Sequence, residues 1–75
     1  MTIEKIIADV FGLPESSIND GLRLSDIATW DSMAHMQLIV ALEESFNVQL
    51  SGDEIADMKS VGDARQLLIA HGTTA

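Results

Sequence analysis

The sequence predicts an all-α fold, a small four-helix bundle with three longer helices, a short third helix and a long loop between the first two. Apolar residues recur at helical spacing in three segments, and small polar residues stand where helix N-caps are expected. One short segment alternates like a strand, but it has no partner segment with which to form a sheet. A chain of 75 residues has room for one core, so residues 1–75 are expected to form a single domain.

The first helix is predicted between Thr2, a candidate N-cap, and Gly12, a candidate C-terminal stop. Its apolar residues recur at the spacing of one helical face. They are Ile3, Ile6, Ile7, Val10 and Phe11.

The segment from Leu13 to Trp30 is predicted to be a loop, because the helical periodicity stops and turn-forming residues such as Pro14 interrupt it. A short helical turn is expected around Ser25 to Ala28. Loops of this length in compact domains are usually functional or disordered. Its apolar residues indicate that the core holds this loop in place: Leu13, Ile18, Leu22, Leu24 and Ile27.

The second helix is predicted from Ser32 to Phe46, with Asp31 as its N-cap. Projection of its residues around a helix gives two apolar stripes. The stripe assigned to the core contains Leu38, Ile39, Leu42 and Phe46, with His35 on the same side. The other, here called the methionine strip, contains Met33, Met36 and Val40, and its polar neighbours are Gln37, Glu43 and Glu44.

The third helix is predicted to be short. The alternating residues Phe46, Val48 and Leu50 are interpreted as an extended connection that leads to it. Ser51 and Glu54 have the spacing of a capping box, which predicts the start of a helix. That helix is expected to carry the apolar residues Ile55 and Met58.

The last helix is expected to begin after Ser60, its N-cap, and to end near Gly72. Residues 73–75 are expected to form a frayed tail. The apolar residues that share one face of this helix are Val61, Ala64, Leu67 and Leu68.

Composition limits the classes of partner. Twelve acidic residues against four basic ones give a net charge of −8, which argues against nucleic acids and anionic membranes and favours a basic partner protein. The chain has no cysteine, and no apolar run approaches the about 18 residues of a membrane span. The N-terminal residues also lack the basic region of a signal peptide, so a cytoplasmic location is expected. The size and charge of the chain favour a monomer.

Ser32 is the main candidate functional residue, because a helix N-terminus carries partial positive charge and unpaired N–H groups that suit a phosphate ester. The structural alternative is an ordinary helix start. His35 would be within reach of Ser32, but the orienting acid, oxyanion donors and pocket of a hydrolase are missing. We expect His35 to be a partly buried, hydrogen-bonded side chain.

The remaining polar and aromatic candidates have structural interpretations. Trp30 is expected to pack one turn into the second helix as a hydrophobic staple. His71 is expected to cap the last helix or to be exposed. No metal site is predicted, because the two histidines lack a patterned carboxylate set and the acids around Glu54 lack the central glycine of a calcium loop.

The stretch TWDSMAHMQLIVALEESFNVQL resembles the acyl carrier protein family, including the peptidyl and D-alanyl carriers. Asp31, Ser32 and Met33 are similar to the Asp-Ser-Leu that marks the start of the second helix in this family. ALEESFNV resembles the family's A-L-E-E-x-F-x-V, and SVGDARQLL resembles its T-V-G-D-A. The resemblance extends over almost the whole chain.

The resemblance implies that Ser32 is the attachment site for 4′-phosphopantetheine, which a separate magnesium-dependent phosphopantetheinyl transferase takes from coenzyme A. Asp31 would help to position that transferase and the helix start. The arm ends in a thiol that holds an acyl or aminoacyl group as a thioester, and the carrier itself has no catalytic activity. The second helix would dock the loading and transferring enzymes through Met33, Met36, Gln37, Val40, Glu43 and Glu44.

The sequence departs from the family's fatty acid carriers at Ala34 and Gln37, where those carriers usually have acids. Together with Trp30 and Met33, these departures indicate a specialised pathway, and polyketide, aminoacyl and polysaccharide-modification pathways all remain open. The alternative function is a small acidic adaptor that binds a partner through the second helix without a prosthetic group. For the methionine strip, the alternative is burial beneath the long loop.

Overall fold

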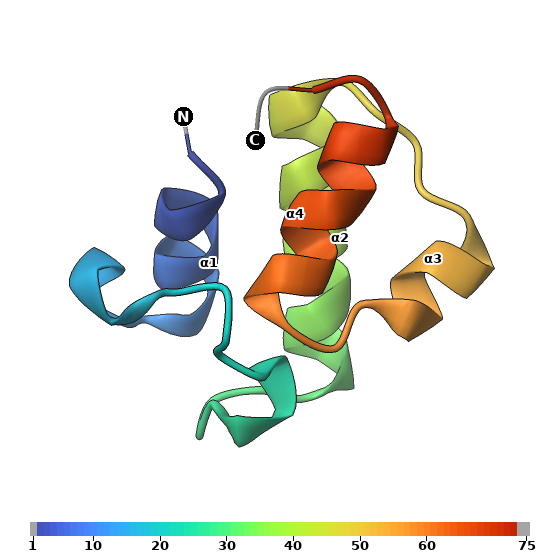
Figure 1. Ribbon diagram of the computed structural model, residues 1–75. Helices are drawn as coiled ribbons and strands as arrows, with labels where there is room; N and C mark the ends of the chain where they lie inside the picture. Colours follow the sequence, from blue (N-terminus) through green and yellow to red (C-terminus); the bar gives the residue numbers. More distant parts are fainter. Residues whose placement is uncertain (1, 74–75) are drawn as a thin grey trace.

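The structure is a computed structural model that describes residues 2–73 of the chain, and the regular elements among these residues are helices joined by loops (Figure 1). The predicted all-α class and the long first loop are confirmed. Between residues 2 and 73, β-pairing is limited to one isolated bridge. The elements in chain order are α1 (Ile3–Phe11), the 3₁₀ turns η1 (Glu15–Ser17) and η2 (Leu24–Asp26), α2 (Ser32–Phe46), α3 (Gly52–Asp57) and α4 (Val61–Ala70).

Helix α1 forms as the sequence predicts. The Thr2 side chain accepts a hydrogen bond from the backbone N–H of Lys5, and Gly12 ends the helix in the left-handed conformation with φ +70°. That backbone conformation is open to glycine without steric cost. The apolar face of α1 packs against α2, although Val10 at its edge is only half-buried.

One hydrophobic core joins all four helices and the long loop. The α2 stripe assigned to the core supplies Leu38, Ile39 and Leu42, which are buried, whereas Phe46 at the end of the stripe is half-buried. The other fully enclosed large side chains are Ile3, Ile7, Leu24, Val61 and Leu68. Because these residues come from α1, η2, α2 and α4, the loop is part of the core.

The loop between α1 and α2 is anchored by the buried side chains of Ile18, Leu24 and Ile27, as predicted. The helical turn expected at residues 25–28 is displaced, since η2 begins one residue earlier and ends at Asp26, where the N–H donates to the carbonyl of Arg23. The other turn, η1, was not predicted. Such single 3₁₀ turns are closed by local bonds and leave no helical periodicity in the sequence.

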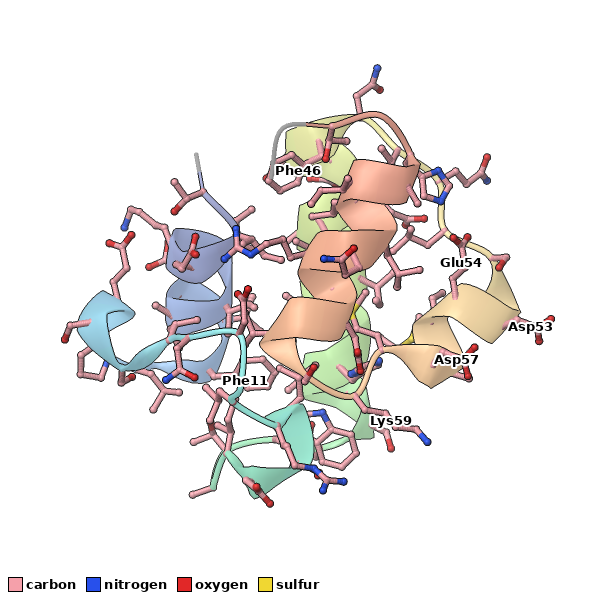
Figure 2. All side chains as sticks on the ribbon, in the orientation of Figure 1. Phe11, Phe46, Asp53, Glu54, Asp57 and Lys59 are labelled. Atoms are coloured by element: carbon pink, nitrogen blue, oxygen red, sulfur yellow. The ribbon has the colours of Figure 1, made fainter. Side chains whose placement is uncertain are left out.

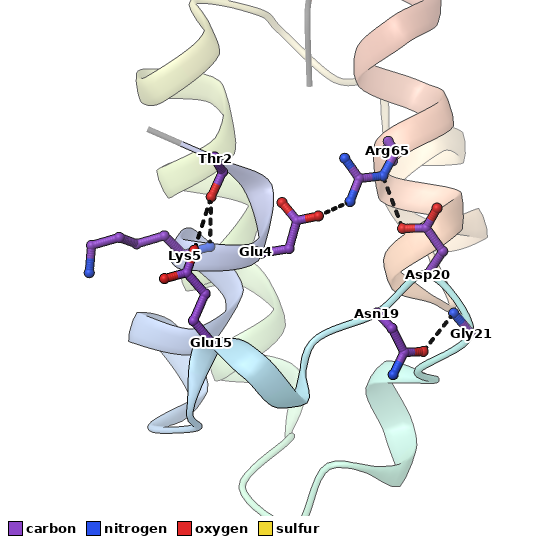
Figure 3. Close-up of polar contacts among 8 residues, drawn as sticks. All are labelled: Thr2, Glu4, Lys5, Glu15, Asn19, Asp20, Gly21 and Arg65. Carbon is purple, nitrogen blue, oxygen red and sulfur yellow. Dashed lines mark hydrogen bonds and ion pairs between the residues drawn. The ribbon is translucent and has the colours of Figure 1, made fainter.

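An ion-pair cluster connects α1, the loop and α4. Arg65 of α4 pairs with Glu4 of α1 and, through Nε, with Oδ1 of Asp20 at 2.9 Å (Figure 3). The hydrogen bonds that the Arg65 guanidinium donates to these two carboxylates, the bond to Glu4 first, raise the pKa of Arg65. These partners are far apart in the sequence, and no local pattern predicts such a cluster.

Helix α2 is followed by its C-cap, Asn47, which adopts the left-handed conformation with φ 53°. The following residues form the predicted extended connection. The carboxylate of Glu43 accepts the N–H of Leu50 at 2.9 Å and so fastens this connection to α2. Helix α3 opens with the predicted capping box of Ser51 and Glu54. It ends at residue 57, and Met58 is therefore its buried C-cap instead of a helical residue.

Helix α4 begins after Ser60 as predicted, and the Asp63 carboxylate completes a second capping box there. The helix stops at residue 70, and Gly72 follows in the left-handed conformation with φ 86°. The prediction of a frayed tail is wrong at Thr73, because the backbone N–H of Thr73 donates a hydrogen bond to the carbonyl of Leu68 at 3.1 Å. The rest of that predicted tail, residues 74–75, lies outside the described residues.

Candidate functional site

Ser32 occupies the first position of α2. Asp31 precedes it in an extended conformation, and its Oδ1 accepts the backbone N–H of Ala34 at 2.7 Å. The carbonyl of Asp31 also accepts the first helical hydrogen bond, from the N–H of His35 at 2.9 Å. Asp31 therefore fixes the residue at which the helix starts, as the sequence predicts.

The Ser32 side chain is exposed. Within residues 2–73 its hydroxyl forms no hydrogen bond, and Asp31 directs its carboxylate to Ala34. The backbone N–H groups at the start of an α-helix have no partner within the helix, and in α2 these include the N–H groups of Ser32 and Met33. The helix dipole adds partial positive charge at the same place. A reactive partner can thus reach the hydroxyl, and an anion attached to it would be favoured.

Trp30 and His35 form the wall beside this site. The indole N–H of Trp30 donates to Nδ1 of His35 at 3.4 Å, and the two rings meet edge to face with centroids 6.0 Å apart. His35 lies at the fourth helical position, so Trp30 packs one turn into α2 as the staple prediction requires. Nε2 of His35 lies 3.2 Å from the carbonyl oxygen of Ile55 in α3.

These contacts exclude a Ser32–His35 dyad in this arrangement. A general base must offer a free ring nitrogen to the hydroxyl. In His35 one nitrogen receives the Trp30 N–H and the other faces the Ile55 carbonyl. The prediction that His35 is half-buried and hydrogen-bonded is confirmed, and the ring acts as a structural connector between α2 and α3.

His71 has a partner that the sequence did not predict. Its Nε2 lies 2.9 Å from Oε2 of Glu54, so the residue after α4 is joined to the first turn of α3. The backbone N–H of Ser51 and, second, the side chain of His71 lower the pKa of Glu54 below the usual value.

Among residues 2–73, no group of three or more potential ligands is close enough to hold a metal ion. None of the described helices is both long and apolar enough to span a bilayer.

The methionine strip is exposed. Met33 has 72% of its surface exposed, and Met36 and Val40 each have 49%. Burial of the strip beneath the loop is therefore wrong. The strip lines a shallow hollow of about 420 Å³ together with Gln37, Ala41 and Glu44. Glu43 does not line this hollow, because its carboxylate turns to the backbone of Leu50.

A second cavity, of about 470 Å³, lies between η2, the start of α2 and α3. Trp30 and His35 form part of its wall, and the basic residues Arg23 and Lys59 also line it. Sequence reasoning missed this cavity, because its walls come from segments that only the tertiary fold brings together.

Comparison with known proteins agrees with this geometry. Residues 2–68 match a family model described as the phosphopantetheine attachment site. The chain is 36% identical over 62 residues to an acyl carrier protein of Acidothermus cellulolyticus, covering 83% of this chain and 74% of that protein. It is 33% identical over 69 residues to an acyl carrier protein of Clostridium acetobutylicum, covering 92% and 90% of the two chains.

Solved structures show the same similarity. The solution structure of a holo acyl carrier protein from Geobacter metallireducens matches with a TM-score of 0.81 and 31% identity, covering 91% of this chain and 78% of that one. A holo acyl carrier protein from Nitrosomonas europaea matches with a TM-score of 0.74 and 29% identity, covering 93% and 89%. The chain belongs to the acyl carrier protein family, whose members are non-catalytic carriers with a covalently attached 4′-phosphopantetheine.

Proposed function

We propose that Ser32 carries the phosphopantetheine arm and that the chain presents acyl or aminoacyl thioesters from it to the enzymes of a specialised pathway. The observation that carries this proposal is the exposed hydroxyl of Ser32 at the first position of α2, without a hydrogen-bond partner in the described part of the chain. The arm supplies the thiol that this cysteine-free chain lacks.

The surroundings of Ser32 suit a phosphodiester. The free amides and the dipole at the start of α2 favour a negative charge there. Asp31 is the acid nearest to Ser32 in the sequence, and its Oδ1 accepts a hydrogen bond from the backbone N–H of Ala34. The carrier needs no general base of its own, since the phosphopantetheinyl transferase activates the hydroxyl. Asp31 has the remaining role of fixing the helix start that the transferase must recognise.

Partner enzymes would dock on the methionine strip. As an acyl carrier protein, the chain works with a phosphopantetheinyl transferase and with biosynthetic enzymes. Met33, Met36 and Val40 are exposed beside Ser32 on the same helix, and methionine adapts to several partner surfaces. Gln37 and Glu44 border the strip. Glu43 is left with a mainly structural role at the end of α2.

A specialised pathway is supported by the chemistry around the strip. Gln37 is exposed and uncharged on the surface that would meet a basic enzyme, so one source of electrostatic attraction is missing. Ala34 is half-buried against the core and offers no charge either. A partner selected by this surface would depend more on apolar contact than on charge.

The experiment is an intact-mass measurement of the purified apo protein after incubation with coenzyme A, magnesium and a broad-specificity phosphopantetheinyl transferase. We expect the wild type and Ser16→Ala to gain one phosphopantetheinyl group each, and Ser32→Ala to gain none. Ser16 is a matched control because it is an exposed serine in another part of the chain. No gain by the wild type, or an equal gain by Ser32→Ala, would refute the assignment and favour the adaptor function.

A further inference from the structure

The sulfur atoms of this chain belong to methionine alone, since the sequence contains four methionines and no cysteine. Met33 and Met36 have 72% and 49% of their surfaces exposed, whereas Met58 has 2%. Met1 lies outside the described residues. Within residues 2–73, a dissolved oxidant can therefore reach Met33 and Met36 directly, and it reaches Met58 only when the core opens locally.

The two exposed methionines lie about one turn apart on one face of α2. Residues three positions apart in a helix are neighbours on its surface. Met33 and Met36 both line the hollow of about 420 Å³, together with Val40. The core-facing stripe of α2 ends at Phe46, which Figure 2 shows at the end of the helix. The methionine strip is thus a separate apolar surface that begins beside Ser32.

This surface has few groups that can satisfy an added polar oxygen. The other residues that line the hollow are Gln37, Ala41 and Glu44. Among the described residues that line it, Gln37 alone has a side-chain N–H donor. The carboxylate of Glu44 is an acceptor and cannot donate to a second oxygen. An oxygen added to either methionine would therefore find at most one side-chain donor from this chain when a partner covers the strip.

Oxidation of a methionine adds such an oxygen without breaking the chain. The thioether sulfur attacks hydrogen peroxide, so that an S–O bond forms and the O–O bond breaks. The other oxygen leaves as hydroxide, takes the remaining peroxide proton and becomes water. The sulfur is oxidised by two electrons and the peroxide is reduced by the same two. The product is a polar sulfoxide, which methionine sulfoxide reductases convert back to the thioether.

We propose that Met33 and Met36 form a reversible oxidation site, at which hydrogen peroxide switches off the docking of partner enzymes. The inference rests on the proposed function, since it needs enzymes that dock on the methionine strip. Docking there depends more on apolar contact than on charge, because Ala34 and Gln37 carry no charge. A sulfoxide oxygen buried in that interface would lose its water without gaining an equivalent donor, which weakens the complex.

The test uses the apo protein, which has no thiol that would consume the oxidant. The protein is treated with hydrogen peroxide, catalase removes the peroxide before any other enzyme is added, and peptide mass mapping gives the sulfoxide content at each methionine. We expect Met33 and Met36 to be oxidised at least roughly 10-fold faster than Met58, which needs local opening of the core. The oxidised protein should keep a cooperative thermal transition, because the two sites are on the surface.

Docking is measured as the KM of a phosphopantetheinyl transferase for the apo carrier, with coenzyme A in excess. We expect peroxide treatment to raise this KM roughly 5- to 150-fold, the effect of a polar oxygen left without a partner in an interface. Treatment with the reductases for both sulfoxide epimers should return the KM to its untreated value.

The variant Met33→Leu/Met36→Leu keeps apolar side chains in the strip but has no sulfur there to oxidise. Whatever the KM of the untreated variant, peroxide should not change it. The control Met58→Leu, a substitution of similar volume in the core, should keep the wild-type response to peroxide. Oxidation of Met1 is common to all three proteins and cancels in the comparison.

Three results would overturn the inference. Equal rates of oxidation at Met58 and Met36 would show that exposure does not select the site. An unchanged KM after complete oxidation of Met33 and Met36 would show that docking tolerates the sulfoxides. A rise in KM that persists in Met33→Leu/Met36→Leu would place the sensitive group elsewhere. Failure of the untreated wild type to accept any arm is distinguishable from these results, because it refutes the proposed function before any oxidant is added.

Discussion

The indole N–H of Trp30 and Nδ1 of His35 are joined by a hydrogen bond of 3.4 Å, and this contact connects the residue before Asp31 to the second turn of α2. Nε2 of the same ring faces the Ile55 carbonyl at 3.2 Å. One nitrogen accepts and the other donates, so the two contacts require the neutral Nε2–H tautomer. The imidazole thus holds the start of α2 and the short helix α3 in one arrangement.

His35→Phe should lower the free energy of unfolding by about 1–3 kcal/mol, because it keeps an aromatic ring but removes two hydrogen bonds of about 0.5–1.5 kcal/mol each. Trp30 emission should shift to longer wavelength as the indole loses its partner. Trp30→Phe removes only the first bond and should cost less. Urea unfolding measures both changes. Unchanged stability in His35→Phe would mean that neither contact contributes to the fold.

Gly62→Ala should destabilise the protein, although alanine usually favours a helix over glycine by about 1 kcal/mol. A Cβ at Gly62 would lie 3.0 Å from the carbonyl oxygen of Asp20, which also accepts the Gly62 N–H at 3.0 Å. Backbone would have to move to relieve that contact. The loss should be about 1 kcal/mol or more, in the range of overpacked sites.

Gly52→Ala is the matched control for Gly62→Ala. Gly52 also lies in the first turn of a helix, but a Cβ there meets no atom within 4 Å. Its substitution should be neutral or should stabilise by up to about 1 kcal/mol, through the smaller entropy of the unfolded chain. Unfolding of both variants by urea makes the comparison. Equal effects would show that the approach of Asp20 to α4 does not constrain residue 62.

Much of the fold is predictable because its determinants are local. The boundaries of α2 follow from the Asp31 cap and the apolar period that ends at Phe46, and both are correct in the structure. The capping box of Ser51 and Glu54 marks the start of α3 in the same way. The Asp31 cap therefore also predicts the position of Ser32 in the first turn of α2.

The features that the sequence did not predict depend on contacts between distant segments. The bridge of Arg23 with Ser60 and the pairing of Glu54 with His71 are decided by how the loop and α3 pack on the core. Neither of these two contacts leaves a periodic pattern in the sequence. The exposure of Met36 could not be predicted from the sequence either, since it depends on whether the loop between α1 and α2 covers this face of α2.

Glu54→Gln should lower the melting temperature at neutral pH, and the difference from the wild type should disappear in acid. The pKa of Glu54 is lowered in the folded state, first by the Ser51 N–H and then by His71. A lowered folded pKa gives stability that is present above the unfolded pKa and is lost as the pH falls through the folded pKa. The two melting curves should therefore converge as the pH falls below about 4.3, the usual pKa of a glutamate.

Asp53→Asn is the control for that pH dependence. Asp53 is in the same first turn of α3 and its substitution removes the same charge, but Asp53 is exposed and takes no part in the capping box. We expect a smaller change in melting temperature than with Glu54→Gln. An equal change in both variants would assign the effect to the helix dipole instead of the bonds from Ser51 and His71.

Met36→Glu should weaken the interaction with a partner enzyme without unfolding the carrier. Met36 lies at the centre of the methionine strip with half of its surface exposed, so an enzyme that docks there would cover its apolar side chain. A glutamate would lose that contact and bring an unpaired charge into the interface, at a combined cost of about 1.5–3 kcal/mol. This corresponds to a KM for the holo carrier that is roughly 10- to 150-fold higher.

Ile69→Glu is the matched control, because Ile69 on α4 is exposed to 48%, close to the 49% of Met36, but lies away from the strip. Both substitutions should change the free energy of unfolding by less than about 0.5–1 kcal/mol, as surface changes usually do. KM with the transferase, or with any enzyme that loads the holo carrier, should rise for Met36→Glu and stay near the wild-type value for Ile69→Glu. An equal rise in both variants would indicate that added negative charge, and not the loss of an apolar contact on α2, controls docking.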